Sequence, residues 1–157
     1  MPFFRTSYGT EHEASQVGYV LASVPERCVI VVDQDLPPGL AANAAAVVAL
    51  TLGAREPSLV GPELVDADEQ AHPGLIPIGL PVLKAPRAAL RELRGRAAAA
   101  GVGVIGMPAF GQQTTDYEAV RAAVAETPAS ELDYLGVAVY GEGRPVRRLT
   151  GNLPLLR

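Results

Sequence analysis

Apolar segments and turn-forming segments alternate along the chain, and their order predicts an α/β domain. Residues 28–32 form a continuous apolar run with β-branched side chains, which is typical of a strand buried on both faces. After a turn-rich loop at 33–39, the almost wholly apolar residues 40–52 predict a helix that ends at Gly53. Because this helix is apolar on all sides, we expect it to be covered on more than one side. A buried strand followed by a buried helix indicates an α/β fold.

The next apolar segments predict three further strands and a second helix. Residues 75–83 contain two prolines, which cannot donate to a ladder, so we expect an edge strand or an irregular one. Pro86 suits the first turn of a helix that ends at Gly101. The third and fourth strands are expected at residues 102–107 and 134–140. The apolar stripe of the second helix consists of Leu90, Leu93, Ala97 and Ala100.

A capping box at residues 115–118 predicts the start of another helix. The Thr115 hydroxyl can accept from the amide three residues on, and Glu118 can reach back. This helix is expected to run from Asp116 to about residue 126, before a proline. Residues 146–156 then predict a short helical turn and a tail packed on the core.

The expected domain organisation is simple. Residues 27–157 are expected to form a single domain, preceded by an extension at 1–26. The extension is mixed and aperiodic, so we expect it to be loosely ordered, with a short strand at 19–22 as its one candidate element. Residues 56–74 hold three prolines and several acidic residues, and predict an excursion over the surface.

Composition narrows the class of protein. The chain has 157 residues, 48% of them hydrophobic and 19% charged, which suffices for one globular core. No apolar run approaches the length of a membrane span and no secretory signal is visible, so we expect a cytoplasmic protein without membrane contact. The single cysteine, Cys28, excludes an internal disulfide.

Charge argues against nucleic acid as a partner. The formal net charge is −4, and Lys84 is the one lysine among 13 basic residues. An acidic chain without a dense basic run is a poor candidate for binding a phosphate backbone. Two stretches are richer in arginine, and we expect solvated helix faces there. They hold Arg87, Arg91, Arg94 and Arg96, and Arg144, Arg147 and Arg148.

Several motifs of the chain are shared with one bacterial family. They are residues 28–46 (CVIVVDQDLPPGLAANAAA), 59–62 (LVGP), 66–68 (DAD), 72–75 (HPGL) and 149–156 (LTGNLPLL). On these motifs the chain strongly resembles the family called domain of unknown function 2000. The resemblance covers about residues 27–157, and it brings no established activity with it.

A more remote resemblance concerns the fold. Asp35, Leu36 and Gly39 follow an apolar strand and precede an Ala-rich helix, and residues 150–153 read Thr-Gly-x-Leu. Both features are similar to peptidyl-tRNA hydrolase II. The resemblance implies a three-layer α/β/α fold with a small, mixed, mostly parallel four-stranded sheet. It also implies a homodimer.

The catalytic residues of that hydrolase are not matched. Its lysines and histidine correspond here to Pro37, Leu40, Ala42 and Ala49, and its aspartate after the third strand corresponds to Ala109. Cleaving the ester of a peptidyl-tRNA requires phosphate neutralisation and a positioned proton donor or acceptor. The resemblance therefore favours a shared fold without the hydrolase site, and leaves open whether the chain is an enzyme.

A candidate ligand site lies at the strand ends. Ligands of open α/β sheets bind outside the carboxyl ends of the strands, where we expect the loops at 33–43 and 108–116 to converge. Free amides at the helix start near Gly39 favour a small anion. Alternatively, the aspartates cap the turn and the glutamines join the loops. The candidate ligand-binding residues are Asp33, Asp35, Gly39, Asn43, Gln112, Gln113, Thr114 and Asp116.

Asn43 is the most informative of these residues, because it interrupts an apolar helix. A buried amide without partners costs about 1–3 kcal/mol. Its partner is therefore a ligand, a second subunit or a neighbouring loop residue such as Gln112, and the loop is the favoured choice.

Other polar residues carry weaker signals. Asp66, Asp68, Glu69 and His72 form an acidic cluster that could hold a divalent ion, but such loops are common on surfaces. We expect His72 to fix the loop, and predict no metal site. Cys28 is expected to be a small core residue rather than a nucleophile. No dinucleotide fingerprint, phosphate-binding loop or Ser-His-Asp signature occurs, so no cofactor is predicted.

Three functions follow from these observations. The favoured one is binding of a small polar molecule between the two converging loops. The second is hydrolysis of peptidyl- or aminoacyl-tRNA by a rebuilt site around Asp33, Asp35, Gln112 and Gln113. The third is a non-catalytic homodimer, with the apolar helix 40–52 in its interface.

Overall fold

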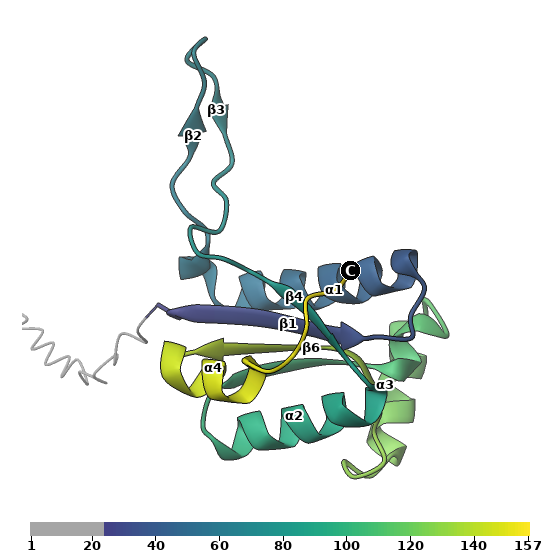
Figure 1. Ribbon diagram of the computed structural model, residues 1–157. Coiled ribbons are helices and arrows are strands. Elements are labelled where there is room, and N and C mark those ends of the chain that lie inside the picture. The colour runs from purple at the N-terminus through teal and green to yellow at the C-terminus, as the bar shows by residue number, and fades with distance from the viewer. Residues whose placement is uncertain (1–23) are drawn as a thin grey trace, which may run out of the picture.

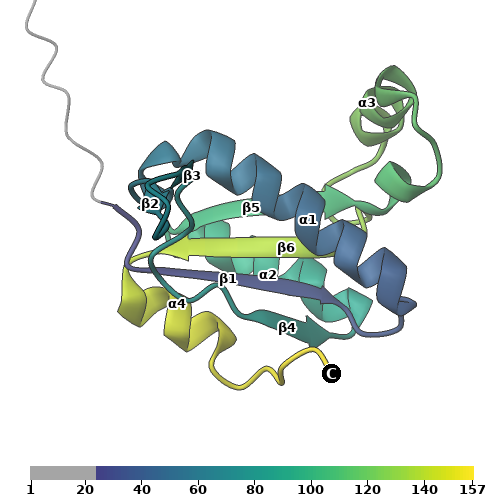
Figure 2. The same cartoon turned by 90° about the horizontal axis from the view of Figure 1, so that it is seen from above.

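The computed structural model describes residues 24–157, which fold around a mixed four-stranded sheet (Figure 1, Figure 2). Its strands are β1 (Arg27–Asp33), β4 (Val82–Ala85), β5 (Gly103–Pro108) and β6 (Tyr134–Gly141), in the order β4-β1-β6-β5. β1 pairs in parallel with β4, and β6 pairs antiparallel with both β1 and β5. Three strands thus share one direction, and the inner strand β6 opposes them. The strand expected at 19–22 lies outside the described residues.

Helices cover both faces of this sheet, as Figure 1 shows. α1 (Pro38–Arg55) lies on one face, and α2 (Arg87–Ala99) and α4 (Gly143–Thr150) lie on the other. Val29 and Val31 pack with α2 and α4, whereas Ile30 and Val32 pack with α1. The continuous apolar run of β1 is therefore explained by burial on both faces, and the predicted α/β fold is confirmed.

α1 differs from its prediction in length and in burial. It continues through Gly53 to Arg55 and ends at Glu56, because the following Pro57 disfavours a helical conformation at the preceding residue. Its inner face is buried through Ala41, Ala44, Val48 and Leu52. Its outer face exposes Leu40, Val47 and Leu50. We expected this helix to be covered on more than one side, but within residues 24–157 of one chain only its inner face is buried.

The segment after α1 holds a hairpin that the sequence did not predict. A 3-10 turn, η1 (Pro57–Leu59), leads into β2 (Leu64–Val65) and β3 (Ala71–His72), which pair antiparallel. Figure 1 shows this hairpin projecting from the body on the α1 side of the sheet. We call residues 60–75 the arm. After it the chain runs irregularly to β4, which is shorter than expected because the prolines of 75–81 do not support a ladder.

The remaining elements follow the predictions closely. Leu90, Leu93 and Ala97 of α2 are buried, whereas Ala100 ends the helix exposed. A 3-10 turn, η2 (Ala109–Gln112), follows β5, and α3 (Tyr117–Glu126) begins after it. The cap of α3 is Asp116 instead of the expected Thr115, since its carboxylate accepts from the amides of the second and third helical residues.

The C-terminal tail packs on the sheet, as expected. The Lys84 amide donates to the Pro154 carbonyl, and the Leu156 amide donates to the Val82 carbonyl, both at 2.9 Å. The tail therefore covers the outer edge of β4. On the opposite edge of the sheet, the outer side of β5 pairs with no other described strand.

Candidate functional site

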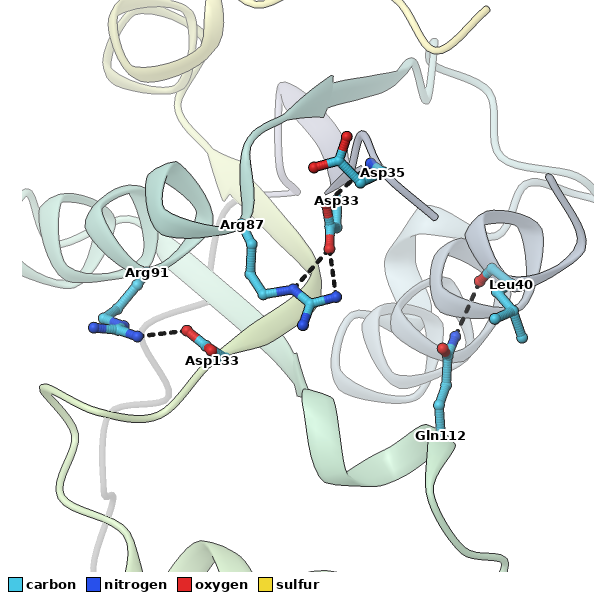
Figure 3. A network of polar contacts seen from close by, with 7 residues as sticks. All are labelled: Asp33, Asp35, Leu40, Arg87, Arg91, Gln112 and Asp133. Atoms are coloured by element: carbon cyan, nitrogen blue, oxygen red, sulfur yellow. Dashed lines mark hydrogen bonds and ion pairs between the residues drawn. The ribbon is translucent and has the colours of Figure 1, made fainter. Parts of the chain in front are cut away.

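The carboxyl end of β1 is closed by an ion pair (Figure 3). Asp33 is 1% exposed, and its Oδ2 accepts from Nε and Nη2 of Arg87, each at 2.7 Å. Its Oδ1 accepts from the Asp35 amide at 3.1 Å. Asp33 thus joins β1 to the start of α2 and caps the turn. Its carboxylate is engaged within the chain, while Asp35 is exposed beside it.

Two further α2 arginines have partners. Arg91 pairs with Asp133, the residue before β6, and donates to the Ser130 carbonyl at 2.7 Å. Arg94 lies over the Tyr134 ring, 5.5 Å from its centroid. These arginines bind residues at the strand ends. The expectation that this stretch of arginines is simply a solvated helix face is therefore wrong for Arg87, Arg91 and Arg94.

The two predicted loops meet at the start of α1. The Gln112 side chain donates to the Leu40 carbonyl at 3.1 Å and joins η2 to the first turn of the helix (Figure 3). Asp116 is used as the cap of α3. Gly39 and Gln113 are exposed, and neither lines the groove described next.

A groove of about 570 Å³ lies between α1, β5 and the segment from η2 to α3. Of the candidate residues, Asn43 and Thr114 line it. Asn43 is exposed, so water can satisfy its amide and the expectation of a buried amide that requires a partner is wrong. The favoured loop partner, Gln112, donates to the Leu40 carbonyl instead. The other lining residues are Val47, Thr51, Ile105, Gly106, Met107, Pro108, Gly111, Thr115, Tyr117 and Val120.

The groove is mostly apolar, and none of its lining residues is charged at neutral pH. Its polar side-chain groups are one amide, three threonine hydroxyls and the phenolic hydroxyl of Tyr117. The Thr51 hydroxyl donates to the Val47 carbonyl at 3.2 Å, and the Thr114 hydroxyl accepts from the Asp116 amide at 3.0 Å. Such a lining suits a neutral molecule with an apolar body.

The sequence analysis missed most of this lining, although one signal was available. Asn43, Val47 and Thr51 are spaced four residues apart and therefore share one face of α1. The contributions of β5 and α3 had no such signal, because they depend on how these elements pack beside α1.

The other candidates have structural roles. Burial raises the pKa of the Cys28 thiol to about 11, with a smaller contribution from Glu56, so the thiol stays protonated and unreactive at neutral pH. On the arm, Asp66 accepts from the Asp68 and Gln70 amides and lies 2.8 Å from His72 Nε2. His72 therefore fixes this turn, as expected. Within residues 24–157, no three His, Cys, Asp or Glu side chains are grouped closely enough to hold a metal ion.

No helix within residues 24–157 is long and apolar enough to cross a membrane.

One comparison with known proteins identifies the family, and another finds a solved structure with a similar fold. No curated protein matches the sequence. The structure of Atu0240, a protein of unknown function from Agrobacterium tumefaciens strain C58, matches with a TM-score of 0.76 and 16% identity, over 82% of this chain and 96% of that one. The family described as Protein of unknown function (DUF2000) matches residues 26–157, and the chain therefore belongs to the DUF2000 family.

Proposed function

We propose that this protein binds a small neutral molecule in the groove between α1, β5 and α3. The observation that carries the proposal is the groove itself, which is uncharged and mostly apolar and presents the exposed Asn43 amide at its wall. A side-chain amide both donates and accepts hydrogen bonds. The groove volume of about 570 Å³ lies within the range of about 300–1,000 Å³ that is usual for small-ligand sites.

The lining suggests the chemistry of the ligand. Val47, Ile105 and Met107 offer apolar surface for the body of the molecule. Asn43 and the Thr115 hydroxyl offer hydrogen bonds to an amide, lactam or alcohol. The amides near Gly39 lie outside this lining, so an anion is no longer the favoured ligand.

We also infer that the fold is of the peptidyl-tRNA hydrolase II type. The mixed sheet, its antiparallel inner strand and the helices on both faces support this inference. The hydrolase activity has less support. The groove has no charged side chain to neutralise a phosphate, and the Asp33 carboxylate is already bound by Arg87.

The proposal is tested by ligand-observed NMR with a panel of neutral N-acetyl amino acid amides and lactams, each beside its carboxylate counterpart. We expect the neutral compounds to bind more tightly. Asn43→Ala should weaken binding about 5–30-fold, because one hydrogen-bonding amide is lost. Val120→Trp should fill the groove and abolish binding.

Gln113→Ala is the matched control, since it removes an exposed amide that does not line the groove. Unchanged binding in both Asn43→Ala and Val120→Trp would place the ligand elsewhere. A parallel assay, which follows release of free tRNA from an N-blocked aminoacyl-tRNA beside an authentic peptidyl-tRNA hydrolase, tests the alternative. Turnover there would replace our proposal with a rebuilt hydrolase site.

A further inference from the structure

The groove runs along a free edge of the sheet. Four consecutive residues of β5 line it, namely Ile105, Gly106, Met107 and Pro108. Successive residues of a strand face opposite sides of a sheet, so a hollow over one face is lined by alternate residues. Ile105 and Met107 pack on the α1 side, whereas a Cβ on Gly106 would lie 2.6 Å from the Tyr134 ring on the α2 side. Lining by all four residues therefore places the groove at the outer edge of β5.

This edge of β5 has no strand paired to it. β6 pairs with one side of β5, and the other side pairs with no strand within residues 24–157. An unpaired edge presents a row of N–H and C=O groups, which proteins ordinarily protect with charged residues, prolines or bulges. Residues 103–107 contain no charged residue and no proline, and the pairing with β6 shifts only between Met107 and Pro108. Most of the edge therefore remains able to pair with a further strand.

α3 forms the far wall of the groove without closing it. This helix packs on η2 and makes no extensive contact with β5. Figure 2 shows it projecting from the body beyond the end of β5. Tyr117 and Val120 of α3 line the groove, and Tyr117 is 74% exposed. Backbone groups of a strand edge thus lie between two walls of uncharged side chains, one on α1 and one on α3.

We propose that an extended, uncharged peptide segment binds in this groove and pairs with β5 as a fifth strand of the sheet. The inference rests on the proposed function and names the class of its ligand. The N–H and C=O groups of an extended peptide are complementary to those of a free strand edge. At about 3.3 Å per residue, the part of β5 that lines the groove would pair with roughly four residues of peptide.

The walls of the groove favour particular side chains on this peptide. Those that point toward α1 meet Asn43, Val47 and Thr51, which offer an amide, an apolar surface and a hydroxyl. A charged side chain would lose water there without gaining an ion pair, because no lining residue is charged. Apolar and hydroxyl-bearing side chains are therefore favoured, and β-branched ones also suit an extended backbone.

The probe is the capped peptide acetyl-Thr-Val-Thr-Val-Thr-amide, added to the isotope-labelled full chain and followed by NMR. We expect it to bind and to slow hydrogen exchange at least about 10-fold at those β5 amides that do not pair with β6. A counterpart that is N-methylated at its three inner peptide nitrogens lacks the donors for pairing. It should bind at least about 10-fold more weakly.

A pair of α3 variants tests the far wall. Tyr117→Ala removes an exposed aromatic side chain from the groove and should weaken peptide binding at least about 5-fold. Glu126→Ala is the matched control, because it changes an exposed residue of the same helix that does not line the groove. It should bind the peptide like the wild type.

The outcomes separate this inference from the proposed function. If the small neutral compounds bind and the peptide does not, the proposed function stands and the inference fails. If neither binds, both fail. Peptide binding that leaves β5 exchange unchanged would overturn the inference, as would equal binding of the N-methylated counterpart. Protection of the same amides that grows with protein concentration, without peptide, would assign the edge to a second copy of the chain and would also overturn it.

Discussion

Helices α1 and α2 cover opposite faces of one sheet, and their outer surfaces differ completely. The 13 residues of α2 include five charged side chains, and its arginines bind the ends of β1 and β6. α1 has no charged residue before Arg55. Both helices bury one face against the sheet, but only α2 has an outer face suited to water.

The difference shows that α2 has a buried apolar face and a charged solvent-facing one, whereas α1 leaves apolar side chains exposed on its outer face. The open side of α1 supplies one wall of the groove and also exposes Leu40 and Leu50. The groove of the proposed function thus lies beside the apolar helix, whereas the charged helix stabilises the strand ends. Three further experiments test this contrast.

The largest effect is expected from a pair of identical truncations. Leu90 of α2 is fully buried, so Leu90→Ala should lower the free energy of unfolding by about 2–5 kcal/mol. Leu50 of α1 is 78% exposed, so Leu50→Ala should change it by less than about 0.5 kcal/mol. Urea denaturation, at a concentration where the chain is monomeric, measures both. Equal losses would show that the outer face of α1 is buried within one chain.

An intermediate effect is expected at the ion pair that α2 makes with β1. Arg87→Met leaves the buried Asp33 carboxylate without its main partner and should cost about 1–3 kcal/mol. Arg96→Met is the control on the same helix, because no ion pair of Arg96 is found within residues 24–157. It should lie within about 0.5 kcal/mol of the wild type. If thermal denaturation finds the two variants equal, Arg87 does not hold the strand end.

The smallest effect is expected on the arm, next to the open helix. The hydrogen bond from His72, with those from two backbone amides, lowers the pKa of the Asp66 carboxyl below its ordinary 3.8. A lowered folded-state pKa stabilises the turn above pH 3.8, and this stabilisation is lost as the pH falls through the lower value. The turn should therefore open only at acid pH.

Carboxyl carbon NMR of Asp66 measures this titration directly. His72→Gln should move the pKa of Asp66 back toward 3.8, while the urea midpoint of the whole domain stays unchanged because the arm is exposed. An Asp66 that already titrates at 3.8 in the wild type would contradict the described turn.

Much of the fold could be predicted because its signals are local. A pattern of only a few residues is enough to predict the β-branched strand β1, the apolar stripe of α2 and the strand β6. The arm escaped prediction because each of its strands has two residues, too few to form a period. The cap of α3 shifted by one residue because both Thr115 and Asp116 are good capping residues and the sequence does not rank them.

The candidate site was predictable only in its location. Sequence alone determined that the loops after β1 and β5 carry polar side chains and that strand ends are where ligands bind. It also determined the apolar character of α1, since that is a property of the residues themselves. Tertiary structure decided which of these side chains are already bonded within the chain. Asp33 pairs with Arg87, 54 positions away, and Gln112 donates to the Leu40 carbonyl, 72 positions away. It also decided that Asn43 faces a groove and that one side of α1 stays open. Such contacts depend on how separate elements pack against each other, which no local pattern encodes.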